Sequence, residues 1–407
     1  MARRQINQHA EEDRSSNSRC YDGGTLKEVE QSIRDAARTL GFAMVGFAPL
    51  RRLDDRAQFF RAWLDEGRAA EMAWLAREPD RRLDPTILDP RLRSVISLAF
   101  PYAAPAIPQI DWRAELRGRI AAYALGPDYH DIVLAKARLV ADQLLSLRPN
   151  AVVRSYVDTG PVLEREWAAE ARLGWFGRNT NLLNRYAGSY FFLAEIFTDI
   201  EFDGPAEPYR DHCGTCRQCL DRCPTNALAD GYLLEPRLCL SYLTIENRGP
   251  IPLELRHKLG NWIFGCDICQ EVCPWNSDAN LSDPRSAGLI PSLAELMRLD
   301  EPGFRRRYGK TAIKRTKRRG LLRNAAIALG NSGNPAAISI LAQALIDDPE
   351  ALVRGHAAWA LGQFAEISAR SNLERAVPHE NDQTVLGEIR SALDCAPTPG
   401  ANREFTR

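Results

Sequence analysis

A run of four closely spaced cysteines constrains this chain more than any other feature of its sequence. Residues 213–224 read CGTCRQCLDRCP, so that two, two and three residues separate the cysteines and a proline closes the run. Gly214 relieves backbone crowding in so tight a loop, because glycine has no side chain. Thiolates that are fixed at such short range act as metal ligands. We therefore expect a metal-bearing loop at this place in the fold.

The spacing is typical of bacterial ferredoxins, in which three thiolates bind one four-iron cluster and the fourth thiolate reaches a second cluster. A second run, GCDICQEVCP at 265–274, has one cysteine fewer, and Cys239 between the runs completes the number. The sequence therefore predicts two 4Fe-4S clusters. Applying the crossed ligation of two-cluster ferredoxins, we assign one cluster to Cys213, Cys216, Cys219 and Cys273 and the other to Cys223, Cys239, Cys266 and Cys269.

Zinc sites and disulfide bonds are the alternatives for so many cysteines. Zinc sites favour paired CxxC units over a CxxCxxCxxxCP run. Disulfides need an oxidising compartment, and residues 1–24 are polar without the apolar segment of an export signal. We therefore expect a cytoplasmic protein with reduced thiols. Cys20 and Cys395 lie near the chain ends and are not expected to be ligands.

The composition separates the chain into units without identifying a partner. Lys plus Arg and Asp plus Glu each number 53, so only the distribution of charge is informative. No segment approaches the roughly 20 consecutive apolar residues of a membrane helix. The 407 residues allow two or three domains. We expect a disordered extension at 1–24, an α/β domain at 25–200, a cluster module at 201–290, a helical domain at 291–394 and a tail at 395–407.

The first domain alternates helical and strand patterns. We predict helices at 26–40, 57–77, 131–147 and 161–173, and strands at 42–48, 94–102, 119–126, 151–158 and 188–202. No GxGxxG follows a strand and no Walker motif occurs, so the usual nucleotide-binding fingerprints are missing. The pattern indicates an α+β or α/β domain of another kind.

Two segments of this domain carry polar residues that could form a functional site. Asp158 lies where a strand gives way to a helix, in VDTGPVLERE. A carboxylate there either helps to cap the helix or acts at the C-terminal end of a strand, where α/β folds place reacting groups. The loop LGWFGRNTNLLN at 173–184 carries Arg178, Asn179, Asn181 and Asn184. Its amides suit a polar ligand such as the propionamides of a corrin, or a solvated turn.

The C-terminal third combines a basic stretch with a repeat. Residues 304–323, FRRRYGKTAIKRTKRRGLLR, contain ten Lys or Arg and no acid. Such a run forms a solvated face or binds polyphosphate, and its density in a neutral protein favours nucleic acid. NAAIALG at 324–330 recurs 32 residues later as HAAWALG at 356–362. Small residues that recur at this period in paired helices predict a short HEAT-like array.

Taken in order, these motifs resemble those of the epoxyqueuosine reductases, cobalamin and iron–sulfur enzymes that complete queuosine in tRNA. The cluster cysteines lie at that family's spacings, and Ala122 departs from it where relatives often carry cysteine. The matching segments are RLDP at 82–85, YALGPDYH at 123–130, YVDTGPVLERE at 156–166, LGWFGRNT, GSYFFL, CLSYLTIE at 239–246, GCDICQEVCPWN and RNAAIALG.

The resemblance implies an α+β multidomain fold with a nitroreductase-like cobalamin-binding α/β domain, a ferredoxin-like two-cluster module and C-terminal HEAT-like α-helical repeats. It implies reduction of epoxyqueuosine at the wobble position of tRNA by cob(I)alamin, which two 4Fe-4S clusters supply with electrons. Asp158 is the expected proton donor, which requires that burial raise its pKa far above about 3.9. The expected cofactor-binding residues are Arg82, Asp158, Arg178, Asn181, Ser241, Gly265 and Cys266.

The partners follow from the same resemblance. The cobalamin motif DxHxxG is missing, because Asp131-Ile132-Val133 follows His130, so we expect base-off cobalamin without a histidine ligand. The anticodon stem-loop is expected to bind Lys314, Arg315, Lys317 and Arg318. We also expect an external low-potential electron donor, a monomer and no membrane. A corrinoid reductive dehalogenase and a non-enzymatic iron–sulfur electron-transfer adaptor are the alternatives.

Overall fold

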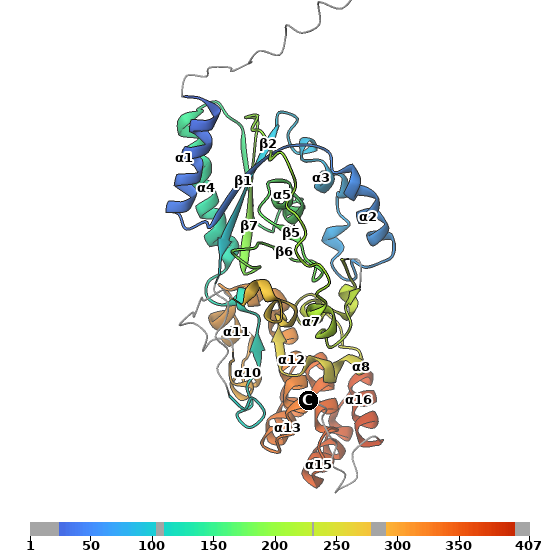
Figure 1. Ribbon diagram of the computed structural model, residues 1–407. Coiled ribbons are helices and arrows are strands. Elements are labelled where there is room, and N and C mark those ends of the chain that lie inside the picture. The colour runs from blue at the N-terminus through green and yellow to red at the C-terminus, as the bar shows by residue number, and fades with distance from the viewer. Residues whose placement is uncertain (1–23, 103–109, 230–231, 278–289, 395–407) are drawn as a thin grey trace, which may run out of the picture.

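A computed structural model describes residues 24–102, 110–229, 232–277 and 290–394. Residues 1–23 of the predicted extension and the predicted tail at 395–407 lie outside the described residues. The α/β unit and the helical repeats occupy opposite ends of the molecule, with α7 (Leu240–Ile245) between them (Figure 1). Within the described ranges, no helix is both long and apolar enough to cross a lipid bilayer.

The α/β unit is built on one antiparallel sheet. Its four strands follow the order β1 (Met44–Pro49), β2 (Ser94–Pro101), β7 (Phe191–Thr198) and β4 (Val153–Tyr156). The two central strands are the longest and are buried along most of their length. Their apolar runs suit this position, because a central strand that is covered on both faces needs apolar side chains on both.

Helices cover both faces of the sheet. On one face α1 (Leu26–Thr39) and α4 (Tyr129–Leu147) share a core with the strands. Thr25 and Glu28 form a capping box at the start of α1. On the other face Trp167 of α5 (Glu164–Glu170) is fully buried against Phe197, next to α2 (Asp54–Asp65) and α3 (Pro79–Leu83). The helix expected at 57–77 ends at Asp65, because Gly67 takes a positive φ of 69°.

The strand predicted at 119–126 forms only in part, and it leaves the α/β unit. Only β3 (Arg119–Ile120) is extended, and it pairs in parallel with β10 (Trp262–Phe264) of the cluster segment. Leu116, Ile120, Ala121 and Ala124 are buried in the core that the helical repeats share with the cluster segment. The alanines in this run permit such close packing, since they add little bulk beyond the backbone.

The cluster segment consists of short elements separated by cysteine loops. Each CxxC loop leads into a single turn of helix, α6 (Gln218–Asp221) and α9 (Ile268–Glu271), and these two helices pack together. Short hairpins flank them, and α8 (Leu253–Arg256) follows α7. The hairpins pair β5 (Trp175–Phe176) with β6 (Leu182–Leu183) and β8 (Leu228–Ala229) with β9 (Leu233–Leu234).

The predicted helical array is present, and its repeat has a packing reason. A Cβ on Gly330 would lie 2.9 Å from the backbone of Ala360, and a Cβ on Gly362 would lie 2.7 Å from Ala392. The repeated glycine therefore lets α12, α14 and α16 approach closely. After α10 (Leu293–Met297) and α11 (Glu301–Tyr308), the array runs through α12 (Lys317–Ser332), α13 (Ala336–Asp347), α14 (Ala351–Leu361), α15 (Ile367–Ala376) and α16 (Gln383–Asp394).

Candidate active site

The seven cysteines of the two runs and Cys239 are free thiols that the fold gathers into two groups. Burial and the nearby thiols of Cys213, Cys219 and Cys216 raise the pKa of Cys273 to about 11. Cys213 and Cys273 also pack on the same aromatic residues around Trp175. The fold thus brings Cys273, at the end of the second run, close to Cys213, at the start of the first run. Crossed ligation requires this arrangement.

The second group combines the remaining four cysteines. Burial raises the pKa of Cys269, and the adjacent thiols of Cys266 and Cys239 add to the shift. Cys223 lies close enough to Cys239 to raise the pKa of that thiol as well. The backbone N–H of Ala227 points at Sγ of Cys223 from 3.3 Å, which is the kind of contact that stabilises a cluster thiolate.

Arg178 supports the first cysteine loop. Its guanidinium donates to the carbonyl of Gly214 at 2.8 Å, and Gly214 takes a positive φ of 52° that favours glycine. A cavity lies between the α/β unit and the cluster segment, and Arg178 is absent from its described lining. The structure therefore places it against a cluster loop, although the sequence suggested a contact with the corrin.

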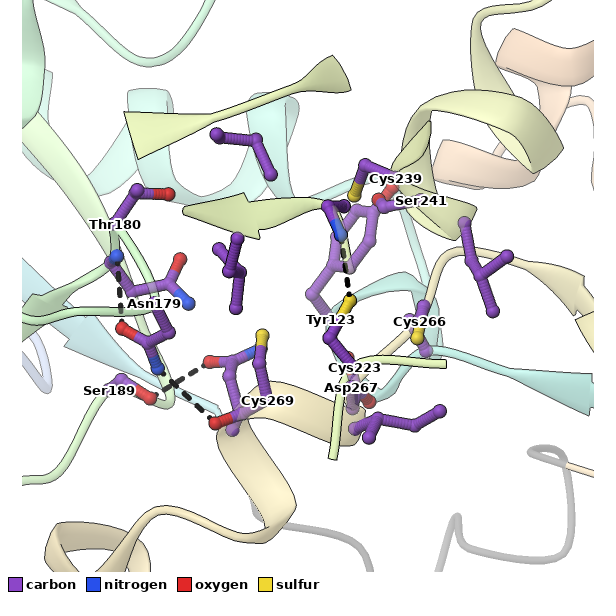
Figure 2. Close-up of a pocket in the computed structure, with 18 of the residues that line it drawn as sticks. Tyr123, Asn179, Thr180, Ser189, Cys223, Cys239, Ser241, Cys266, Asp267 and Cys269 are labelled. Carbon is purple, nitrogen blue, oxygen red and sulfur yellow. Dashed lines mark hydrogen bonds between the residues drawn. The ribbon is translucent and has the colours of Figure 1, made fainter. Parts of the chain in front are cut away.

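A cavity of about 350 Å³ lies where the α/β unit meets the cluster segment (Figure 2). The second cysteine group and the loop at 179–182 both line it, and they meet where Nδ2 of Asn179 donates to the carbonyl of Cys269 at 3.3 Å. Three of the residues expected to bind a cofactor lie in its lining, namely Asn181, Ser241 and Cys266. Three other lining residues, Tyr102, Tyr123 and Asp267, had no expected role, although Tyr123 begins the YALGPDYH segment and Asp267 lies inside GCDICQEVCPWN.

The other asparagines of this loop hold its shape. Oδ1 of Asn179 accepts from the backbone N–H of Asn181 at 3.2 Å, and Nδ2 of Asn184 donates to the carbonyl of Leu173 at 2.7 Å. Both side chains are buried. Their hydrogen bonds leave Asn181 facing the cavity, so the loop has both a structural part and an open part.

Arg82 and Gly265 act behind the cavity and do not line it. Arg82 is buried and donates to the carbonyls of Gly160 and Trp74 at 3.3 and 3.1 Å. Gly265 has a positive φ of 70°, and a Cβ there would lie 2.5 Å from Cβ of Ala121. Arg82 thus supports the turn that follows Asp158, and Gly265 lets Ala121 reach the cavity.

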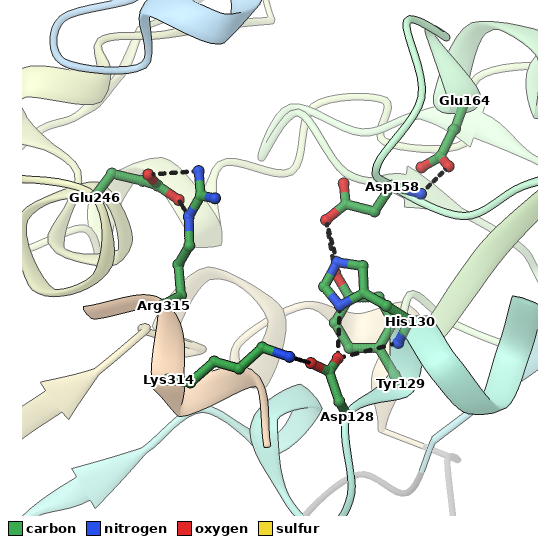
Figure 3. Close-up of polar contacts among 8 residues, drawn as sticks. All are labelled: Asp128, Tyr129, His130, Asp158, Glu164, Glu246, Lys314 and Arg315. Carbon is green, nitrogen blue, oxygen red and sulfur yellow. Dashed lines mark hydrogen bonds and ion pairs between the residues drawn. The ribbon is translucent and has the colours of Figure 1, made fainter. Parts of the chain in front are cut away.

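Asp158 belongs to a chain of polar contacts (Figure 3). Its Oδ2 accepts from the hydroxyl of Tyr129 at 2.7 Å and lies 3.1 Å from Nε2 of His130. Nδ1 of the same imidazole lies 2.6 Å from Oδ1 of Asp128, whose Oδ2 is 2.7 Å from Nζ of Lys314. Tyr129 and His130 begin α4, so the strand-end carboxylate meets a helix N-terminus from the opposite side of the site.

The charge state of Asp158 differs from the sequence-based expectation. Burial acts to raise the pKa of Asp158, but hydrogen bonds from His130 and Tyr129 outweigh it, so the pKa is lowered. Burial acts to lower the pKa of His130, yet its bonds to Asp158 and Asp128 raise it. The proton of this group therefore resides on His130 when the site is at rest. The sequence analysis quoted YALGPDYH for the family resemblance without assigning its histidine a role in proton transfer.

An aromatic contact connects this chain to the cavity. The ring of Tyr129 stacks on Phe192 with a centroid distance of 4.1 Å, and it meets the edge of Tyr123 at 6.0 Å. Tyr123 lines the cavity. The proton-holding group and the second cysteine group are thus separated by this one cavity and its aromatic border.

The basic stretch is only partly as expected. Lys317 is exposed, whereas Lys314 pairs with Asp128 and Arg315 forms a two-pronged pair with Glu246 at 2.8 and 3.0 Å. Arg318 is a correction: it is 7 % exposed and its guanidinium binds Asp348. Helical periodicity explains this, since α12 turns Arg318, and likewise the fully buried Arg323, towards its neighbours. Arg318 has no free surface to offer a phosphate.

Comparison with known families identifies each part of the chain. A family model for the 4Fe-4S double cluster binding domain matches residues 212–276. Models for epoxyqueuosine reductase QueG and for HEAT repeats match residues 82–159 and 310–394. The cluster module and the helical repeats of the sequence analysis are thereby confirmed, and the module is of a kind that binds two 4Fe-4S clusters.

Similarity over the whole chain is equally clear. The epoxyqueuosine reductase of Pseudomonas aeruginosa is 39 % identical over 347 residues, which cover 83 % of this chain and 95 % of the relative. The chain belongs to the epoxyqueuosine reductase family. The Salmonella typhimurium epoxyqueuosine reductase is 37 % identical over 87 % of this chain and 93 % of its own. The dehalogenase and adaptor alternatives are not favoured.

Solved structures of epoxyqueuosine reductases agree with the fold. One, in complex with an epoxyqueuosine-modified tRNA-Tyr stem loop, has a TM-score of 0.84 and 30 % identity over 91 % of this chain and 99 % of its own. Another, from Bacillus subtilis, has a TM-score of 0.84 and 28 % identity over 91 % of this chain and 100 % of its own. In that structure a catalytic aspartate loop is swung out of the active site. The chain is thus an oxidoreductase of a family that acts on tRNA.

Proposed function

We propose that this chain, acting as a monomer, reduces epoxyqueuosine to queuosine at the wobble position of tRNA with cobalamin as its reactive cofactor. The observation that carries the proposal is the cavity itself. It has cluster cysteines on one wall, and Tyr123 at its border contacts Tyr129, which binds Asp158. Electrons and protons can therefore reach a common space from two directions.

The residues that line the cavity suit a large cofactor that carries amide groups at its periphery. Asn181, Ser241 and the backbone around Cys266 would hold the corrin and its amides, and the α/β unit would be a nitroreductase-like domain. The described lining contains no histidine, which supports a cofactor without an imidazole ligand from the protein. Bound there, cobalamin in its Co(I) state would supply the low-potential nucleophile, because the demanding chemistry belongs to the cofactor.

The cluster segment supplies the electrons. Cys223, Cys239, Cys266 and Cys269 would hold the cluster next to the cavity, and the other four cysteines would hold the outer cluster. Two clusters in series can pass single electrons inward from an external low-potential donor, since protein surroundings tune cluster potentials over a wide range.

The polar chain at Asp158 supplies the proton. Converting an epoxide to an alkene and water takes two electrons and two protons, and both carbon–oxygen bonds break. Nε2 of His130, 3.1 Å from Oδ2 of Asp158, passes a proton to this carboxylate, and Asp158 gives it to the departing oxygen. Tyr129 orients Oδ2 of Asp158 through its hydroxyl. The raised pKa of His130 keeps a proton available near neutral pH.

The tRNA would lie across the helical repeats and the mouth of the site. Lys314, Arg315 and Lys317 are its proposed phosphate contacts, and Arg318 is excluded because it is buried. The stem loop bound to a solved relative supports this kind of partner. By analogy with the Bacillus subtilis enzyme, the Asp158 turn would have an inner and an outer position. In this scheme residues 25–200 bind the cofactor, 201–290 carry electrons and 291–394 bind tRNA.

Nucleoside analysis tests this function. Epoxyqueuosine-containing tRNA is incubated with cluster-loaded protein, cobalamin and a strong chemical reductant, and the digested nucleosides are separated. Conversion to queuosine that requires cobalamin supports the proposal, and Asp158→Asn serves as the matched variant. Conversion at the same rate without cobalamin would disprove the cofactor, and no conversion under any loading would disprove the reaction.

A further inference from the structure

A buried glutamate lies close to the Asp158 turn. Glu195 of β7 pairs in register with Ser97 of β2 on one side and Tyr156 of β4 on the other. It has no exposed surface, and among the described residues neither of its carboxyl oxygens accepts a hydrogen bond from a donor. An ionised carboxylate is strongly disfavoured in such surroundings, so Glu195 carries a proton.

The nearest group that can take this proton is another carboxyl. Glu195 and Glu164 are within hydrogen-bonding reach of one another. Two carboxyl groups can form a hydrogen bond only when one of them is protonated, because an ionised carboxylate has no donor. The contact therefore defines the direction of the bond, from Glu195 to Glu164.

Glu164 in turn holds the backbone of the Asp158 turn. Its Oε1 accepts from the backbone N–H of Asp158, and Asp158 has a positive φ of 55° that residues other than glycine avoid. Arg82 binds the carbonyl of Gly160 at the other end of the turn. The turn is thus fixed at both ends by side chains that do not line the cavity.

We propose that a hydrogen bond from the carboxyl group of Glu195 to that of Glu164 holds the Asp158 turn in its inner position. Glu195 donates to Glu164, and Glu164 accepts from Asp158 N–H. Both are positioning residues, since they act through the turn. The proposal rests on the proposed role of Asp158 as the acid of the reaction.

The charges around the pair make its hold on the Asp158 turn depend on pH. Burial and the charge of Asp158 raise the pKa of Glu164 to about 8, although His130 and Arg165 oppose them. Burial and the charge of Glu164 raise the pKa of Glu195. When Glu164 loses its proton in alkaline solution, its charge and that of Asp158 repel one another and loosen the turn. The titratable and charged groups that face the pair are Asp158, Tyr129, His130, Arg82 and Arg165.

Amide hydrogen exchange of residues 157–162 tests the pair independently of turnover, in cluster-loaded protein before cobalamin is added. Glu195→Met removes the donor at nearly constant volume, whereas Glu195→Gln keeps a donor that cannot ionise. Glu170→Gln, on the same helix and paired with Arg51, is the matched control. We expect the Asp158 amide to exchange about tenfold faster in Glu195→Met and unchanged in the other two at about pH 7.

The pH dependence provides the second arm. After correction for intrinsic base catalysis, exchange of the wild-type turn should accelerate between about pH 7 and pH 9, and that of Glu164→Gln should not. Wild-type exchange rates in Glu195→Met, or a Glu195→Gln variant that exchanges as fast as Glu195→Met, would overturn the proposal. If Glu195→Met does not fold, the comparison of Glu164→Gln with wild type across this pH range decides alone. Failure of the proposed function looks different, because Asp158→Asn would then keep its full single-turnover rate.

Discussion

Nζ of Lys314 lies 2.7 Å from Oδ2 of Asp128, and this contact connects the helical repeats to the first turn of α4. Asp128 also binds His130, which in turn binds Asp158. Lys314, next to the proposed tRNA surface, is therefore the last member of this chain of polar contacts. The Lys314 ammonium and His130 together keep the pKa of Asp128 low although burial opposes them. In the proposed function, substrate binding and proton supply would therefore meet at this ion pair.

Lys314 and Lys317 should differ in what their loss changes. Lys317→Ala should lower the slope of log K against log salt for tRNA binding by about one, because it removes one phosphate contact. Lys314→Ala should also slow single turnover at saturating tRNA, since Asp128 loses its cation and no longer holds His130 in place. Salt-dependent binding isotherms and quench-flow rates measure the two effects. Identical single-turnover rates in both variants would show that the Lys314 pair is only a surface contact.

Asp158→Asn should leave the fold and both clusters intact while turnover falls by ~10²–10⁴-fold, as is typical when a general acid is lost. The amide keeps the shape but has no transferable proton. Single-turnover rates and thermal melting, measured side by side, test this. A lower melting temperature with normal turnover per folded molecule would instead assign Asp158 to capping of the following segment.

Cys239→Ala should damage one cluster and spare the other. The thiol lies in the group with Cys223, Cys266 and Cys269, at the wall of the cavity. We expect a three-iron form or loss of that cluster, seen by iron analysis and electron paramagnetic resonance. Cys395→Ala, outside the two runs, is the control. Iron content of about eight per chain in Cys239→Ala would refute the ligand assignment.

Arg318→Ala should destabilise the helical repeats by roughly 3–5 kcal/mol, because it leaves the buried carboxylate of Asp348 without its partner. Arg305→Ala, which removes an exposed pair with Glu301, should change the unfolding free energy by less than about 0.5 kcal/mol. Urea unfolding measures both variants. A tRNA-binding defect in Arg318→Ala without loss of stability would contradict its structural role.

Stability should fall as the pH rises from about 4.5 to about 8 because of Glu164. Between these values the folded state holds a proton that the unfolded state has released, so rising pH favours unfolding. The contribution is at most about 1.4 kcal/mol per pH unit. Glu164→Gln should flatten this part of the curve in denaturant titrations at several pH values. An unchanged slope would mean that Glu164 titrates normally in the folded protein.

Local patterns were sufficient to predict the modules and the cluster cysteines. Each of these patterns can be recognised from residues that are close together in the sequence. They are the cysteine spacing, the repeated NAAIALG and HAAWALG segments and the apolar strands. Contacts between distant segments were not accessible in this way. Nothing near Lys314 predicts its pairing with Asp128, and nothing in the basic run shows that Arg318 turns inward to Asp348. The pKa of Asp158 was misjudged for the same reason, since its direction depends on Tyr129 and His130 of another helix.

The departure of β3 from the α/β unit affects how the chain can assemble. Gly118 lies against Ile263 and Leu293, so this early segment is packed by residues that are synthesised far later. A nascent chain must therefore keep Leu116 and Ile120 unpaired on the ribosome until the helical array emerges. A fragment that ends near residue 200 would expose the same apolar side chains to water. This part of the core can therefore be completed only after the later units have been made.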